Sequence, residues 1–206
     1  MKTIDSIEDL VDLYGDPLER SLWKEINYIN DHYKRFIERS PFLILATMSE
    51  KGIDCSPRGD PAGFVRVVDE KHIQIPDRRG NNRLDSLKNI VSHPNVGIIF
   101  LIPNVGETIR VSGKAKIVVE PELCDSFSIR GKPASSVLSI TVEKAYFQCQ
   151  KALVRSKLWD ASTYVERNDL PTAGEMAKVF AESNNIEFDA QEYDENYPEH
   201  MKNTIY

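Results

Sequence analysis

Hydrophobic positions in the first forty residues recur every three or four residues. The apolar residues that share this spacing are Leu18, Leu22, Ile26, Ile29, Tyr33, Phe36 and Ile37. Such a stripe is typical of one face of an amphipathic helix. Asp16-Pro17 supplies a cap and a first-turn proline, so the sequence predicts a helix from there to Ser40-Pro41. A shorter helical segment is expected to end at Tyr14-Gly15.

From Phe42 onward the hydrophobic period shortens to that of strands. In residues 107–119, apolar side chains at every second position alternate with polar ones, which is typical of a half-buried antiparallel strand. Turn residues separate the other strand-like runs. The expected strands are residues 42–48 and 53–57 as one hairpin, 64–68 and 72–75 as a second, then 96–102, 107–119 and about 136–147.

Helical spacing returns between and after these strands. It predicts helices over about 84–91, from Pro121, over 150–159 and after Thr172. The acidic residues after Glu187 indicate a solvated, partly ordered extension. We therefore expect a mainly β fold, an antiparallel barrel with flanking helices. Its parts are a helical extension over 1–40, the barrel over 41–160, and a C-terminal helix with an acidic tail over 161–206.

Composition narrows the class of protein. The 206 residues carry a net charge of −6, which argues against nucleic-acid binding. No apolar run is long enough for a membrane span and the N-terminus is too acidic for a signal peptide, so a cytoplasmic location is expected. The three cysteines have no paired spacing, which favours free thiols over disulfides or zinc ligands, and we expect no metal site.

Residues 75–90 concentrate positive charge between a strand and a helix. Arg78, Arg79 and Arg83 lie there with a glycine and two asparagines. Unpaired N–H groups at a helix start, with guanidinium groups beside them, suit a phosphate. A solvated turn with an ordinary helix cap uses the same residue types, so both readings stay open at this point.

The order of these elements resembles the FMN-binding split barrels of the pyridoxamine 5′-phosphate oxidase-like family, and most closely its subgroup described as FMN-dependent enzymes. The resemblance rests on four stretches in the expected order, which together span about residues 40–160: residues 56–60, 75–90, 107–115 and 149–159.

This resemblance implies a split β-barrel homodimer with two FMN molecules in grooves between the subunits. It places Arg58, Arg78, Asn82 and Arg83 at the flavin phosphate, with Asp77 in the same junction. Main-chain groups of Ile75 and Pro76 would back the ring. Thr108 and Arg110 would approach from the partner or line the groove floor, and Lys151, Arg155 and Ser156 would close the site.

Each of these residues also has an ordinary structural role to set against the functional one. Arg83 could pair with Asp85, Arg58 with Asp54 or Asp60, and Arg110 across its strand. Lys151 and Arg155 share one helix face, which is often just solvated. Arg78 and Arg79 are neighbours in an extended segment, so only one of them can point inward.

The resemblance implies a flavin-dependent oxidoreductase in which the flavin accepts the hydride, acting on a small molecule that the sequence does not identify. The chain lacks the C-terminal Arg-x-His segment with which pyridoxamine phosphate oxidases grip their substrate, so that activity is not expected. Two alternatives stay open. One is an FMN-binding carrier, sensor or stress-related protein without turnover, and the other is a related barrel that binds haem or a deazaflavin.

Overall fold

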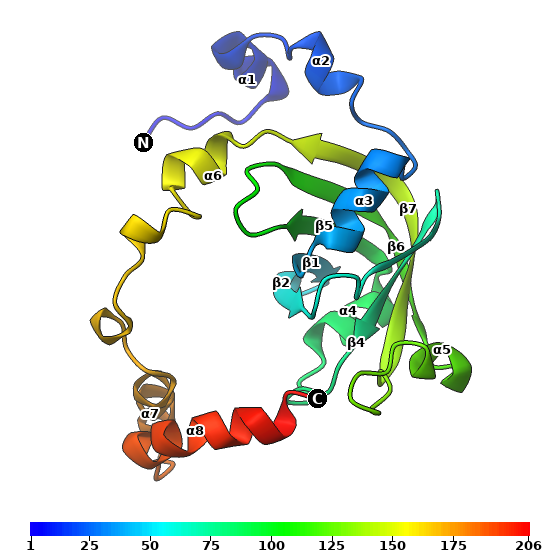
Figure 1. The fold of residues 1–206 in the computed structure, drawn as a ribbon. Helices are drawn as coiled ribbons and strands as arrows, with labels where there is room; N and C mark the ends of the chain where they lie inside the picture. Colours follow the sequence, from blue (N-terminus) through cyan, green and yellow to red (C-terminus); the bar gives the residue numbers. More distant parts are fainter.

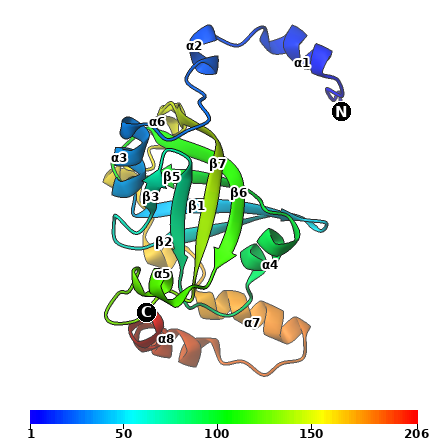
Figure 2. The same cartoon turned by 90° about the vertical axis from the view of Figure 1, so that its right-hand side faces the viewer.

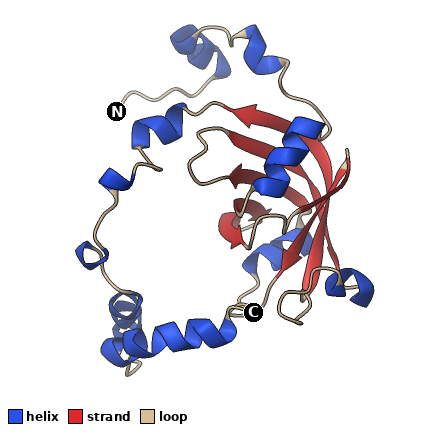
Figure 3. Cartoon of the chain, viewed as in Figure 1, coloured by secondary structure: helices blue, strands red, loops and turns tan.

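A computed structural model describes residues 1–206, and its centre is one antiparallel sheet of seven strands in the order β2-β1-β5-β6-β7-β4-β3 (Figures 1 and 3). The sheet curls on itself, so the predicted mainly β fold, a split barrel with helical extensions, is confirmed. The strands are β1 (Phe42–Ser49), β2 (Gly52–Gly59), β3 (Arg66–Asp69), β4 (His72–Asp77), β5 (Asn95–Leu101), β6 (Thr108–Val118) and β7 (Ser136–Gln148).

Every second side chain along the strands points inward, and these side chains fill the barrel. Leu43, Leu45 and Phe100 are fully buried from β1 and β5, and Ile73 and Ile75 are fully buried from β4. Helix α3 (Asp31–Arg39) adds Tyr33 and Ile37 to the same cluster. Burying side chains of this size contributes about 1.5–3 kcal/mol each, so this cluster is the main source of stability.

The long strands β6 and β7 pair along their whole length, with one irregularity at Ser112/Gly113. There the two backbones approach so closely that a Cβ on Gly113 would lie 2.0 Å from the Thr141 carbonyl oxygen. Only glycine fits such a contact without a shift of the backbone, so this position fixes how tightly the two strands can pair.

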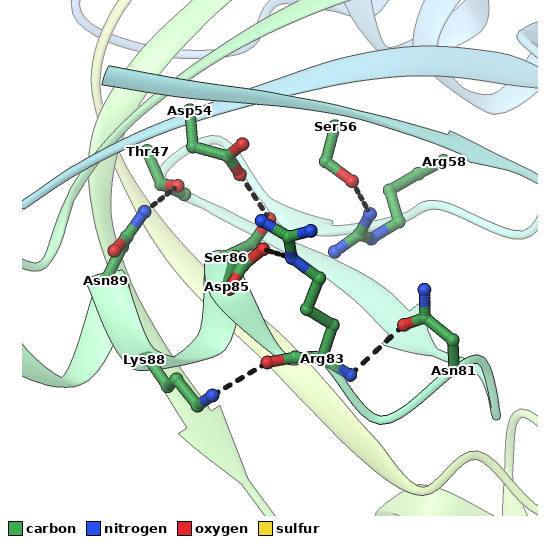
Figure 4. A network of polar contacts seen from close by, with 10 residues as sticks. All are labelled: Thr47, Asp54, Ser56, Arg58, Asn81, Arg83, Asp85, Ser86, Lys88 and Asn89. Atoms are coloured by element: carbon green, nitrogen blue, oxygen red, sulfur yellow. Dashed lines mark hydrogen bonds and ion pairs between the residues drawn. The ribbon is translucent and has the colours of Figure 1, made fainter. Parts of the chain in front are cut away.

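Helix α4 (Asp85–Ser92) packs against β1, β2 and β6. Its Asn89 Nδ2 donates to Thr47 Oγ1 at 3.0 Å, and its Ser86 Oγ donates to Asp54 Oδ2 at 3.3 Å (Figure 4). These bonds tie the helix to the first hairpin. The segment that joins β4 to α4 is therefore held over β2.

The predicted long N-terminal helix is wrong. The structure has α1 (Ile7–Tyr14), α2 (Glu19–Leu22) and α3, with an irregular stretch between the last two. Ile26 lies in that stretch and exchanges backbone hydrogen bonds with Ala145 of β7, at 3.0 and 2.7 Å. This pairing competes with helix formation, and Asn30 then caps α3 through the Tyr33 N–H.

The acidic stretch after Glu187, for which the sequence predicts no helix, contains one. After α5 (Pro121–Asp125) and α6 (Lys151–Ser156), the chain forms α7 (Ala173–Ser183) and the 15-residue helix α8 (Ala190–Thr204). The two helices pack on each other, and Gly174 N–H donates to Asp194 Oδ1 at 2.9 Å. Residues 157–206, which include α7 and α8, form a C-terminal arm. Figures 1 and 2 show this arm curving away from β7 and returning toward α5 and the lower end of the barrel.

No helix in the structure combines the length and the apolar character that crossing a membrane would require.

Candidate functional site

A cavity of about 420 Å³ lies between β2, the end of β4 and the start of α4. The segment 78–84, whose arginines drew attention in the sequence, forms one side of it. Six of the residues expected at a cofactor line this cavity together: Arg58, Pro76, Asp77, Arg78, Asn82 and Arg83.

The start of α4 faces this cavity without a side-chain cap. Its N-cap residue Leu84 has left-handed backbone angles, φ 60° and ψ 25°, and accepts no hydrogen bond with its side chain. Asn82 is also left-handed, with φ 58°. Non-glycine residues in this region store strain and often mark binding sites. The first N–H groups of α4 therefore have no side-chain acceptor and suit an anion.

Arg58 reaches the cavity from β2, with its side chain 22% exposed. Its Nη1 group donates to Ser56 Oγ and to the Pro57 carbonyl oxygen at 3.0 Å, and its Nη2 lies 3.9 Å from Asp77 Oδ1. Burial raises the pKa of the Asp77 carboxyl above its ordinary value, and the Arg58 guanidinium opposes that rise. At 3.9 Å this ion pair is loose, which leaves Arg58 able to bind another anion.

Arg78 is held from two sides. Its Nε donates to Asp60 Oδ2 at 2.9 Å and its Nη1 to the Phe127 carbonyl oxygen at 2.8 Å, while Nη2 has no protein partner. Arg79 is exposed and does not line the cavity. Of the two neighbouring arginines, Arg78 is thus the one that the backbone turns toward the cavity.

Arg83 has a largely exposed side chain, 78% accessible, and its Nε pairs with Asp85. Its backbone N–H donates to Asn81 Oδ1 at 3.1 Å, and its carbonyl oxygen accepts from Lys88 Nζ at 2.8 Å (Figure 4). The ion pair with Asp85 is the ordinary role that the sequence allowed. Exposed pairs of this kind are worth about 1 kcal/mol or less, so a bound phosphate can displace the carboxylate.

The charges around the cavity nearly cancel. Three arginines line it together with four aspartates, which are Asp54, Asp60, Asp77 and Asp85. Recognition of an anion here must therefore rest on directed N–H groups rather than on net positive charge. The donors present are three guanidinium groups, the Asn81 and Asn82 amides and the open start of α4. This set of donors fits a phosphate group.

Apolar surface is scarce in the same cavity. Only four of its 19 lining residues are hydrophobic. A flavin ring needs a flat apolar surface on at least one side, and one chain supplies little of it here. The cavity of a single chain therefore fits a phosphate group better than it fits a flavin ring.

The other expected residues lie elsewhere. Ile75 is buried in the core beside the cavity and Thr108 is buried on β6. Arg110 lies over the Tyr146 ring, 5.1 Å from its centroid, and lines a second cavity of about 490 Å³ on the outer face of the sheet. The α6 residues are exposed at the far end of β7 from the first cavity: Lys151, Arg155 and Ser156.

Several lining residues escaped the sequence reasoning. Asp54 and Ser56 share the face of β2 that carries Arg58, because residues two apart in a strand point the same way. The two-residue spacing back from Arg58 along the strand would have identified both. Asp60 and Asn81 belong to stretches that were singled out, but their side chains were not assigned. Nothing in the sequence pointed to Tyr206, whose hydroxyl donates to Asp60 Oδ1 at 2.6 Å.

Comparison with known proteins gives one family match. The profile of the family described as pyridoxamine 5′-phosphate oxidase matches residues 29–149. This range contains all the strands and the whole lining of the first cavity. No curated protein matches the chain.

Solved structures similar to this chain include three from different bacteria. A tagged form of HupZ from Group A Streptococcus is 21% identical with a TM-score of 0.47, covering 57% of this chain and 91% of that one. General Stress Protein 26 from Bacillus anthracis str. Sterne is 15% identical, TM-score 0.43, with coverages of 55% and 88%. An FMN-binding protein from Syntrophomonas wolfei subsp. wolfei is 13% identical, TM-score 0.44, with coverages of 68% and 92%.

Proposed function

Because the chain belongs to the pyridoxamine 5′-phosphate oxidase family, we propose that it binds FMN in the cavity between β2, β4 and α4 and acts as a flavin-dependent oxidoreductase. The observation that carries this proposal is the convergence of Arg58, Arg78 and Arg83 on one uncapped helix start. These groups come from two separate stretches of the chain, strand β2 and the segment between β4 and α4. Their meeting at one cavity supports a ligand with a phosphate.

Different residues would contact different parts of the cofactor. Arg58, Arg83, the free Nη2 of Arg78 and the Asn82 amide would hold the phosphate. Backbone groups of Pro76, at the end of β4, would lie along the ring. When bound, FMN supplies the capacity to accept and pass on a hydride, so no side chain of the cavity need act as an acid or base.

We further propose that two copies of the chain complete each site. Arg110 and the α6 residues Lys151, Arg155 and Ser156 do not reach the cavity of their own chain. We assign them to the flavin site of a second copy. The outer face of the sheet offers a surface for that copy, because its cavity is lined by Ile44, Ala46 and Ile99 beside Arg110. A homodimer with two sites between its subunits follows.

An anaerobic absorbance titration tests the enzymatic part of this proposal. The FMN-loaded protein is mixed with reduced nicotinamide cofactors in the absence of oxygen. Bleaching of the flavin bands, followed by recovery when an oxidant is added, is expected of an oxidoreductase. Flavin bands that persist with every donor would instead indicate a binding protein without turnover.

A further inference from the structure

Tyr206 is the residue of the C-terminal arm that touches the cavity lining. Its hydroxyl donates to Asp60 Oδ1 at 2.6 Å, and the Asp60 side chain is only 2% exposed. A buried carboxylate costs free energy unless it is paired and hydrogen-bonded. Asp60 meets this condition with two partners, the Tyr206 hydroxyl on one oxygen and Arg78 Nε on the other.

Arg78 connects this pair to the proposed phosphate position. Asp60 and the Phe127 carbonyl oxygen take two of its N–H groups and so fix the plane of the guanidinium. The Tyr206 ring adds a weaker contact, with its centroid 6.0 Å from Arg78 Cζ and 5.2 Å from Arg130 Cζ. The remaining group, Nη2, can then point in only one direction.

The rest of the arm does not explain this contact. Helices α7 and α8 pack on each other and make no comparable contact with any strand. The arm meets the lower end of the barrel through Tyr206, whose carbonyl oxygen also accepts a hydrogen bond from Lys132 Nζ. In Figures 1 and 2 the end of α8 accordingly lies beside the loop that follows α5. The contact of the arm with this part of the barrel is therefore centred on Tyr206.

We propose that Tyr206 is a positioning residue of the cofactor site, which acts through Asp60 to hold Arg78 in the orientation that binds the FMN phosphate. This inference rests on the proposed FMN site and adds a residue more than fifty positions beyond the family match, which ends at residue 149. The hydrogen bond to Asp60 raises the pKa of the Tyr206 phenol, so the hydroxyl keeps its proton and stays a donor through neutral and mildly alkaline pH.

The test compares two ligands that differ only in the phosphate. FMN and riboflavin are titrated separately into the full chain and into its Tyr206→Phe variant, with flavin fluorescence as the signal. Tyr206→Phe keeps the ring over Arg78 and removes only the hydroxyl. Tyr197→Phe is the matched control, because Tyr197 lies on the same arm, outside the lining of the first cavity, with its ring beside those of Tyr193 and His200.

The expected result is a loss of affinity for FMN but not for riboflavin, which lacks the phosphate. Tyr206→Phe should weaken FMN binding about five- to tenfold, which is less than the loss of a direct hydrogen bond to a charged group because Tyr206 acts only through Asp60 and Arg78, while riboflavin binding stays unchanged. Asp60→Asn should weaken FMN binding at least as much, because it removes the charge that orients Arg78. Tyr197→Phe should bind both ligands like the parent protein.

Three outcomes would overturn the inference, and they are distinguishable. Equal affinity of the parent and Tyr206→Phe for FMN would show that Tyr206 does not act on the site. Equal weakening of FMN and riboflavin would show a general structural role. Failure of the parent protein to bind FMN at all would overturn both this inference and the proposed function.

Discussion

At the scale of single residues, the arginines of the cavity each have an aspartate of their own chain beside them. Arg78 is locked to a buried Asp60, whereas Arg83 and Asp85 are exposed and their pair is weak. These pairs keep the guanidinium groups oriented without making the cavity strongly cationic. The more exposed the pair, the more easily a phosphate replaces its carboxylate, so Arg83 should contribute most to binding.

Replacing Arg83 tests that ranking. Arg83→Ala should lower the affinity for FMN by about 1.5–3 kcal/mol, the value of a hydrogen bond to a charged group, or roughly ten- to a hundredfold. The free energy of unfolding should change by less than about 0.5 kcal/mol, because the side chain is exposed.

Isothermal titration calorimetry measures the affinity, and denaturant unfolding measures the stability. Arg79→Ala is the control, since Arg79 lies on the same loop but outside the cavity. Equal affinity of Arg83→Ala and Arg79→Ala for FMN would show that Arg83 makes no contact with the phosphate.

Asp77 makes stability depend on pH. Burial raises its pKa in the folded state above the ordinary value of 3.8, so the folded protein holds this proton more tightly than the unfolded chain. The resulting stabilisation is complete below the ordinary value and is lost as the pH rises through the raised pKa. Ionised Asp77 should therefore destabilise the fold near neutral pH.

Asp77→Asn removes this titration. Its free energy of unfolding relative to the parent protein should increase between about pH 3.5 and about pH 7, because only the parent loses a stabilising proton over that interval. Urea unfolding at a series of pH values measures the difference. A difference that is constant or falls with pH would contradict the assignment.

At the scale of elements, the pairing of β6 with β7 sets the geometry of the barrel. Gly113→Ala should lower the free energy of unfolding by about 2–4 kcal/mol, because its Cβ would lie 2.0 Å from the Thr141 carbonyl oxygen and the strands would have to separate. Gly97→Ala in β5 is the control. The nearest atom to its Cβ would be Ala46 Cβ, at an ordinary 3.8 Å, so its cost should stay below about 1 kcal/mol. Similar costs at both positions, measured by thermal unfolding, would refute the close-approach argument.

The same elements show what the sequence could predict. The seven strands follow from local alternation and turns, and the strand–loop–helix around Arg83 follows from the turn residues between a strand period and a helical period, so both were predicted. The break in the N-terminal helix at Ile26 was not predicted, because it depends on backbone pairing with Ala145, far along the chain. For the site, the arginines near residue 80 could be read from the sequence. The contact of Tyr206 with Asp60 could not, since no local pattern relates residues 146 positions apart.

At the scale of the whole molecule, the proposed dimer explains why predicted site residues lie at opposite ends of one chain. The cavity residues belong to β2, β4 and α4, and the α6 residues lie beyond the far end of β7. If each site combines the cavity of one chain with α6 of another, defects in the two parts should complement each other.

Mixed dimers test this arrangement. Arg83→Ala and Arg155→Ala should each weaken FMN binding as homodimers. After unfolding and refolding of an equal mixture, about one quarter of all sites should regain parental affinity, because half of the dimers are mixed and each has one intact site. Calorimetry or fluorescence titration of the mixture counts these sites. No recovery would show that both residues act within one chain, or that Arg155 is no part of the site.

The most direct test of the central claim is a titration of the purified full chain with FMN, followed by absorbance and fluorescence. The account predicts saturable binding of one FMN per chain, tighter than that of riboflavin because the arginines of the cavity hold the phosphate. No uptake of FMN, or equal affinity for FMN and riboflavin, would contradict it.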